Sequence, residues 1–168
     1  VHTSGLGDQA GAGTDRLALS GMIKRVILGH YGMSPAIASL ALSGDVEAYN
    51  FPQGVLSQLM RRVAGGHPGM LSRIGLGTFV DPRIDGGKLN TATKEDLVKY
   101  VEMDGEEHLY YKIPPPDVAI VRGTTADQLG NISLEHEAGW FEMLSQATAA
   151  SNHGGSSIAQ VARVVDAR

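Results

Sequence analysis

Apolar residues in this chain recur either at alternate positions or at helical spacing, in segments that follow one another. Alternation predicts a strand at 46–51 and two antiparallel strands within 97–113, joined by an Asp104-Gly105 turn. A short apolar run predicts a buried parallel strand at 117–122, and a last strand follows at 158–165. Helical spacing predicts helices at 16–30, 55–63 and 135–150. A further helix is predicted to begin at Ser34-Pro35, with Ser34 as its cap, and to end before Gly44. This order favours right-handed parallel crossovers, so we expect an α/β fold with the 97–113 hairpin as an insertion on one edge.

The stretch from Val46 to Gly87 carries the strongest indication of a binding site. Pro52-Gln53-Gly54 interrupts the strand before the next helix begins, so the amide of Gln53 lies between a strand and a helix. In parallel α/β sheets, ligands bind outside the carboxyl ends of the strands. Seven glycines between 65 and 87 would let the backbone approach a bulky ligand, although turns of α/β proteins are rich in glycine in any case.

Other polar residues are weaker candidates. His30, at the end of the predicted 16–30 helix, could contact a ligand or complement the helix dipole. Arg61 and Arg62 at the end of the 55–63 helix fit a dipole role better than a phosphate contact. Arg122 ends the 117–122 strand and Thr124 follows it, where both could contact a ligand; equally, the threonines and Asp127 could satisfy turn backbone groups.

Composition excludes several classes of function. The 168 residues carry a net charge of −4, without the basic excess that binding to nucleic acid requires. There are no cysteines, so neither disulfides nor thiolate metal sites can form. No apolar run approaches the ~20 residues of a membrane span. We therefore expect a cytoplasmic protein, with a glycine-rich end at 1–15 that forms a loop.

Several motifs, in a fixed order, resemble family I coenzyme A transferases of the acetate, propionate and 3-oxoacid type. They are EAYNFPQG, GLGTFVDPR, GGKLN, YYKIPPPDVAIVRGTTADQLGNISLE and GGSSIAQVARVV. The resemblance runs from about Gly21 to Val165. It implies a three-layer α/β domain with a mainly parallel sheet, in which 1–168 is a single domain of the amino-terminal half of a longer or two-subunit enzyme.

The resemblance also implies a reaction and a set of site residues. Coenzyme A would pass between a short-chain acyl-CoA and a free carboxylate through a glutamyl-CoA thioester, with coenzyme A as a substrate and no cofactor. The resemblance places Gln53 in the oxyanion hole and Gly54 among the substrate-binding residues, where glycine would also let the backbone turn into the helix. Gly77 and Thr78 would line a small acyl pocket, which favours short chains.

The family's nucleophilic glutamate belongs to the second half, and its motif is absent here. Glu137-Ala138-Gly139 has a similar spacing but falls within the predicted 135–150 helix, so we do not expect Glu137 to be the nucleophile. The isolated chain should be inactive and should pair with a second half or β subunit through apolar surface around Tyr110 and Trp140. A homo-oligomer is also expected. An acyl-CoA hydrolase or sugar-phosphate isomerase-like enzyme on the same scaffold, and a non-catalytic assembly or regulatory subunit, remain alternatives.

Overall fold

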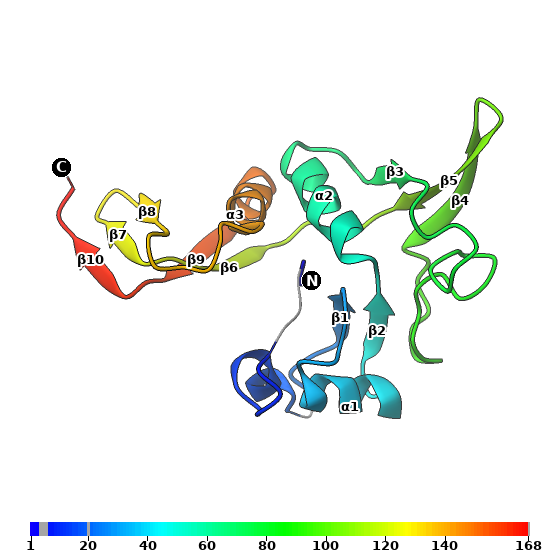
Figure 1. Cartoon of the computed structure of the whole chain (residues 1–168), viewed down its shortest axis with the longest axis horizontal. Helices are drawn as coiled ribbons and strands as arrows, with labels where there is room; N and C mark the ends of the chain where they lie inside the picture. The colour runs from blue at the N-terminus through cyan, green and yellow to red at the C-terminus, as the bar shows by residue number, and fades with distance from the viewer. Residues whose placement is uncertain (4–6, 20, 168) are drawn as a thin grey trace. The chain divides into compact units, whose positions relative to one another are not determined.

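The computed structural model describes residues 1–3, 7–19 and 21–167, which divide into two compact units (Figure 1). The first unit contains Val1–Leu59 and Pro68–Ile113, and the second contains Met60–His67 and Pro114–Arg168. The division falls within one helix, α2 (Gln53–Ala64).

The first unit also contains η1 (Gly13–Leu17), β1 (Arg25–Leu28), α1 (Pro35–Ser43), β2 (Glu47–Asn50), β3 (Met70–Ser72), β4 (Val98–Met103) and β5 (Glu106–Tyr111). The second unit also contains β6 (Val118–Arg122), β7 (Thr125–Asp127), β8 (Ile132–Ser133), α3 (Met143–Asn152), β9 (Ser156–Gln160) and β10 (Arg163–Val165).

A parallel pair of strands, β1 and β2, forms the centre of the first unit and lies in register from Arg25↔Glu47 to Leu28↔Asn50. The free edge of β2 is covered by the segment after residue 86, where Leu89 N donates to Ala48 O and Asn50 N to Gly87 O. Val26, Leu28, Ile37 and Val46 form a buried cluster between this pair and α1. The strand predicted at 46–51 and the helix predicted at 55–63 are confirmed as β2 and α2.

The helix predicted at 16–30 is wrong in the described part of that range, because residues 25–28 form β1. Ser20, within the prediction, lies outside the described residues. Val26, Ile27 and Leu28 are all buried, and a short apolar run buried on both faces has no periodicity that separates strand from helix. His30 therefore lies in the loop after a strand rather than at a helix end.

Helix α1 is confirmed, but its cap differs from the prediction. Ser34 makes no capping bond; its hydroxyl donates to Asp15. The Asp15 carboxylate, only 8% exposed, instead accepts from the backbone N–H groups of Ala36 and Ile37, each at 3.4 Å. A carboxylate from η1, about twenty residues earlier in the chain, thus accepts hydrogen bonds from the free backbone N–H groups at the start of α1.

The predicted 97–113 hairpin is confirmed as β4 and β5, with β3 pairing on the other edge of β5. Asp104 and Gly105 both have positive φ, 56° and 78°, as a two-residue type I′ turn requires. Tyr111 is fully buried, whereas Tyr110 on the opposite face is only partly buried.

In the second unit, β6 and β9 pair in parallel and α3 packs on one face of the pair (Figure 1). The strand predicted at 117–122 is confirmed, but not its complete burial, since Ile120 is 71% exposed. The strand predicted at 158–165 divides into β9 and β10; β10 pairs in parallel with β7, which pairs antiparallel with β8. The helix predicted at 135–150 begins only at Met143; residues 135–142 form turns, bends and irregular chain, and Phe141 has a positive φ of 38°.

Candidate functional site

The carboxyl ends of β1 and β2 meet the start of α2 in the first unit (Figure 1). Phe51 N donates to Leu28 O at 3.0 Å, which continues the pairing of the two strands one residue beyond β2. Leu56 N then donates to Pro52 O at 3.0 Å, so the chain enters α2 at Pro52. Gln53 is the first residue of the helix, at the edge of the sheet where ligands of parallel α/β proteins bind.

The side chain of Gln53 lies against the backbone of Gly29, the residue that follows β1. A Cβ added to Gly29 would be 2.1 Å from Gln53 Cγ, 3.0 Å from Cδ and 3.1 Å from Nε2. Any residue other than glycine at position 29 would therefore displace Gln53 from its present position. Gly29 was not a candidate in the sequence, since its only mark is its position after an apolar run.

The amide of Gln53 is available to a ligand. The side chain is exposed, and its amide group has no hydrogen-bond partner in the part of the chain that the structure describes. It lies at the positive end of the α2 dipole, where the first backbone N–H groups of the helix also lack intrahelical partners. This end of the helix can stabilise a developing negative charge on an oxygen atom.

Gly54 does not have the backbone role expected of it. It is exposed in the first turn of α2, it is not among the residues with positive φ, and an added Cβ would meet no atom within 4 Å. The entry into the helix therefore does not need glycine at this position, and Gly29 is the glycine that Gln53 needs. Substrate contact at Gly54 stays a prediction.

The predicted acyl-pocket residues lie in the 75–87 loop, which is bonded to the end of β2. Gly87 N donates to Phe79 O at 3.0 Å, and Asn50 N donates to Gly87 O at 2.9 Å. Gly77 and Thr78 are both exposed, and the Thr78 hydroxyl donates to Gly75 O at 2.8 Å. The loop and Gln53 are thus both attached to the same end of β2.

A buried carboxylate, Asp81, lies at the centre of this loop and was missed in the sequence. It is 1% exposed, and its Oδ2 accepts from Gly77 N at 2.9 Å and from Arg83 Nη2 at 2.7 Å. Its Oδ1 accepts from Arg83 Nε at 2.9 Å and Arg83 N at 3.0 Å. The Arg83 guanidinium, followed by these backbone donors, holds the pKa of Asp81 well below its usual range despite burial. The Asp-Pro-Arg triplet within GLGTFVDPR was the available signal.

Most of the other polar candidates make contacts within the second unit. Arg122 Nε donates to Glu137 at 3.0 Å, and Glu137 lies in a turn rather than in the predicted helix. Thr124 is buried and its hydroxyl accepts from His136 N at 3.0 Å. Arg61 lies 4.0 Å from Glu142. These contacts favour the structural alternatives for Arg122, Thr124 and Arg61.

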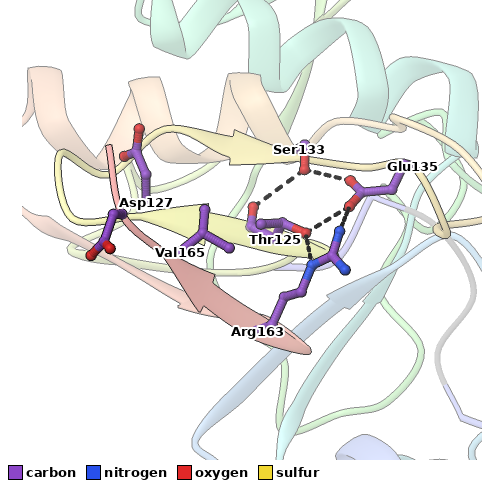
Figure 2. A pocket seen from close by; sticks show the side chains of 7 residues that line it. Thr125, Asp127, Ser133, Glu135, Arg163 and Val165 are labelled. Carbon is purple, nitrogen blue, oxygen red and sulfur yellow. Dashed lines mark hydrogen bonds and ion pairs between the residues drawn. The ribbon is translucent and has the colours of Figure 1, made fainter. Parts of the chain in front are cut away.

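A separate cavity of about 450 Å³ opens in the second unit (Figure 2). Its lining consists of Thr125, Asp127, Ser133, Glu135, Arg163, Val165 and Asp166. Glu135 accepts from the hydroxyls of Ser133 and Thr125, the latter at 2.6 Å, and from Arg163 Nη2 at 3.2 Å. Donation from Ser133, and then Thr125, lowers the pKa of Glu135 to about 2. These four side chains satisfy one another, and none was predicted as a site residue.

Neither a metal cluster nor a membrane helix is found in the described part of the chain. No group of three or more His, Cys, Asp or Glu side chains there could hold a metal ion. No helix among those residues is long and apolar enough to cross a bilayer.

Comparison with known proteins gives one consistent result. The model of the coenzyme A transferase family matches residues 2–168. Acetate CoA-transferase YdiF of Escherichia coli (strain K12) is 48% identical over 165 residues, 98% of this chain and 31% of the relative. Caffeate CoA-transferase of Acetobacterium woodii is 45% identical over 158 residues, 94% of this chain and 30% of the relative.

A solved structure has the same fold. The acyl-CoA transferase YdiF of E. coli O157:H7, described as a thioester complex with CoA, superposes on 98% of this chain with a TM-score of 0.94 and 48% identity. This chain covers 32% of that protein. The predicted CoA-transferase-like α/β fold is thereby confirmed, and the chain spans about a third of the length of these relatives.

Proposed function

Because this chain belongs to the coenzyme A transferase family, we propose that it supplies the oxyanion-hole half of an enzyme that moves coenzyme A between a short-chain acyl-CoA and a free carboxylate. The observation that carries the proposal is the amide of Gln53, which lies against Gly29 at the amino end of α2 and has no hydrogen-bond partner among the described residues. A neutral amide suits this role because it donates a hydrogen bond without forming an ion pair that would trap a carboxylate substrate.

In the proposed reaction, a glutamate carboxylate attacks the acyl thioester, and the carbonyl oxygen becomes an oxyanion facing Gln53. Collapse of this intermediate gives an acyl-glutamyl anhydride and releases coenzyme A as its thiolate. The thiolate attacks the glutamyl carbonyl, forms the enzyme thioester and releases the first carboxylate. A second carboxylate then reverses these steps, so neither a metal nor a redox cofactor is consumed. The relative whose structure is described as a thioester complex with CoA supports this route.

The nucleophile is proposed to lie outside this chain. Glu137 is held by Arg122 in the second unit and takes no part in the proposal. Since the relatives are about three times as long as the aligned segment, the missing glutamate would lie in a second half or a partner subunit. Gly77 and Thr78, in the loop attached to the end of β2, would line the acyl group, with Gly54 beside Gln53 at the start of the helix.

The test is exchange of coenzyme A between acetyl-CoA and propionate by the complete enzyme. Gln53→Ala should lower kcat by about 10²–10³, the usual effect of losing one oxyanion donor. Gln58→Ala is the matched control, because Gln58 is also exposed on α2 but lies more than one helical turn after Gln53. It should leave the rate unchanged.

Three results would contradict the proposal. If both glutamine variants kept the full rate, Gln53 would not be an oxyanion donor. If the complete enzyme released free coenzyme A without exchange, a hydrolase would replace the transferase. If it did neither while carrying the family's second half, a non-catalytic subunit would be the better conclusion.

A further inference from the structure

The 75–87 loop contains four glycines, and glycine leaves more backbone conformations open than any other residue. Gly75, Gly77, Gly86 and Gly87 have φ values of 98°, 69°, 63° and 74°, a region that glycine enters easily but also leaves easily. Gly77 and Thr78 are exposed, and an added Cβ on Gly77 would meet no atom within 4 Å. Side-chain packing therefore does not fix Gly77.

Asp81 supplies an internal support for this loop. Its backbone O accepts from Ile84 N at 2.9 Å and Gly86 N at 3.0 Å, and its own N–H donates to Thr78 O at 2.9 Å. Its carboxylate holds the Gly77 N–H. One residue thus ties together both ends of the loop and the segment that would line the acyl group.

The carboxylate is itself held in place by the hairpin. Arg83 binds both Asp81 oxygens, and its Nη1 donates to Glu107 on β5 at 2.7 Å. The guanidinium also lies over the ring of Tyr100 on β4, with Cζ 4.5 Å from the ring centroid. The half-exposed Arg83 therefore links the hairpin to the buried carboxylate of Asp81.

We propose that Asp81 is a positioning residue that, through Arg83 and the β4–β5 hairpin, fixes the Gly77–Thr78 backbone and so sets which acyl chain length the enzyme accepts. The effect on acyl chain length rests on the proposed function. The support of the loop by Asp81 does not depend on it. This support also gives the hairpin insertion a role in specificity rather than in stability alone.

The experiment uses Asp81→Asn in the complete enzyme. The amide keeps the shape but removes the negative charge and places an NH₂ where one oxygen was. If the NH₂ replaces Oδ2, Gly77 N loses its acceptor; if it replaces Oδ1, Gly77 N keeps an acceptor that is no longer charged. In both orientations the charge-assisted hydrogen bond to Gly77 N is lost. Two quantities are measured: the amide hydrogen exchange rate of Gly77, and the ratio of kcat/KM for acetyl-CoA to that for hexanoyl-CoA with propionate as acceptor. We expect Gly77 to exchange about tenfold faster or more, since a charge-assisted hydrogen bond is lost. We expect the preference for acetyl-CoA over hexanoyl-CoA to fall by about tenfold, which is within the range of discrimination that the shape of an apolar pocket provides.

Two controls separate positioning from stability. Arg73→Gln removes the 3.4 Å ion pair with Glu106, which lies on the same hairpin but does not contact Asp81, and should change neither quantity. Ile37→Ala destabilises the buried cluster beside α1 and should lower the melting temperature without changing the acyl ratio.

The outcomes distinguish this inference from the proposed function. An unchanged acyl ratio in an active Asp81→Asn enzyme would overturn it, as would unchanged exchange at Gly77. If the unsubstituted enzyme transferred no coenzyme A, the proposed function would fail, and the support of the loop by Asp81 would be decided by the exchange rate of Gly77 alone.

Discussion

The contact between Gly29 and Gln53 leads to a prediction in which activity and stability separate. In Gly29→Ala, the new methyl group would lie 2.1 Å from Gln53 Cγ, far inside van der Waals contact. Gln53 is exposed and can leave by rotation of its side chain, so relief of the clash requires no change in the core. Because Gly29 does not have a positive φ, alanine also fits the backbone there.

The clash with Gln53 and the compatible backbone at position 29 determine the expected changes in kcat and in the free energy of unfolding. Replacing glycine by alanine at a compatible backbone position changes the free energy of unfolding by about 0.4–1 kcal/mol in the stabilising direction. Displacing the amide removes one oxyanion donor, which costs about 2.7–4 kcal/mol in the transition state, or 10²–10³ in kcat. We therefore expect the complete enzyme with Gly29→Ala to have lost most of its rate and none of its stability.

The assay is acetyl-CoA/propionate exchange, with urea unfolding of the same preparations. Gly65→Ala serves as the control: Gly65 also lacks a positive φ, and its nearest atom to an added Cβ is at 3.4 Å, ordinary contact. The double variant Gly29→Ala/Gln53→Ala should be no slower than Gln53→Ala alone, because both changes remove the same donor. Additive losses, or an unimpaired Gly29→Ala enzyme, would show that Gly29 does not act through Gln53.

Two further predictions concern stability. Asp15→Ala should lower the free energy of unfolding by about 1–2 kcal/mol in urea titrations, because the start of α1 loses its cap and the buried Ser34 hydroxyl loses its acceptor; a change below about 0.3 kcal/mol would contradict the capping role. The pKa of Glu135 falls from 4.5 to about 2 in the folded chain through hydrogen bonds from Ser133 and Thr125, so its contribution is complete above pH 4.5 and disappears as the pH falls toward 2. Glu135→Gln should flatten the fall in melting temperature over that pH window, and an unaltered pH profile would refute this assignment.

The sequence identified those elements whose signal is local. The Asp104-Gly105 pair predicted a hairpin because a type I′ turn demands two residues that tolerate positive φ, and both have it. Pro35 predicted the start of α1 because proline fits the first turn of a helix. In both cases the backbone requirement falls on residues adjacent in the chain.

The errors occurred where the determining partner is distant in sequence. Residues 25–28 form a strand because β2, about twenty residues later, offers a parallel edge, and the apolar run itself carries no period. Asp15 caps a helix that begins at Pro35, a contact that no spacing rule anticipates. For the same reason Gln53 was found as a candidate, but Gly29 was not. Gln53 belongs to a recognisable Pro-Gln-Gly motif, whereas the need for glycine at position 29 arises only when the residue after β1 packs against the start of α2.

The exposure of Gln53 bears on what the remainder of the proposed enzyme must do. A hydrogen bond that competes with water contributes only about 0.5–1.5 kcal/mol, whereas an oxyanion donor in a site closed to water contributes several times that amount. Among the described residues, Gln53 is exposed and its amide has no hydrogen-bond partner. In this chain alone, a hydrogen bond from Gln53 would therefore contribute only the smaller of these two free energies. The absent two thirds of the relatives' length would therefore have two tasks: to bring the glutamate nucleophile, and to cover Gln53 so that the same amide gains its full effect on the transition state. A partner that supplied the glutamate but left Gln53 open to water would form the covalent intermediate slowly, because the charge on the oxyanion would still be shared with solvent.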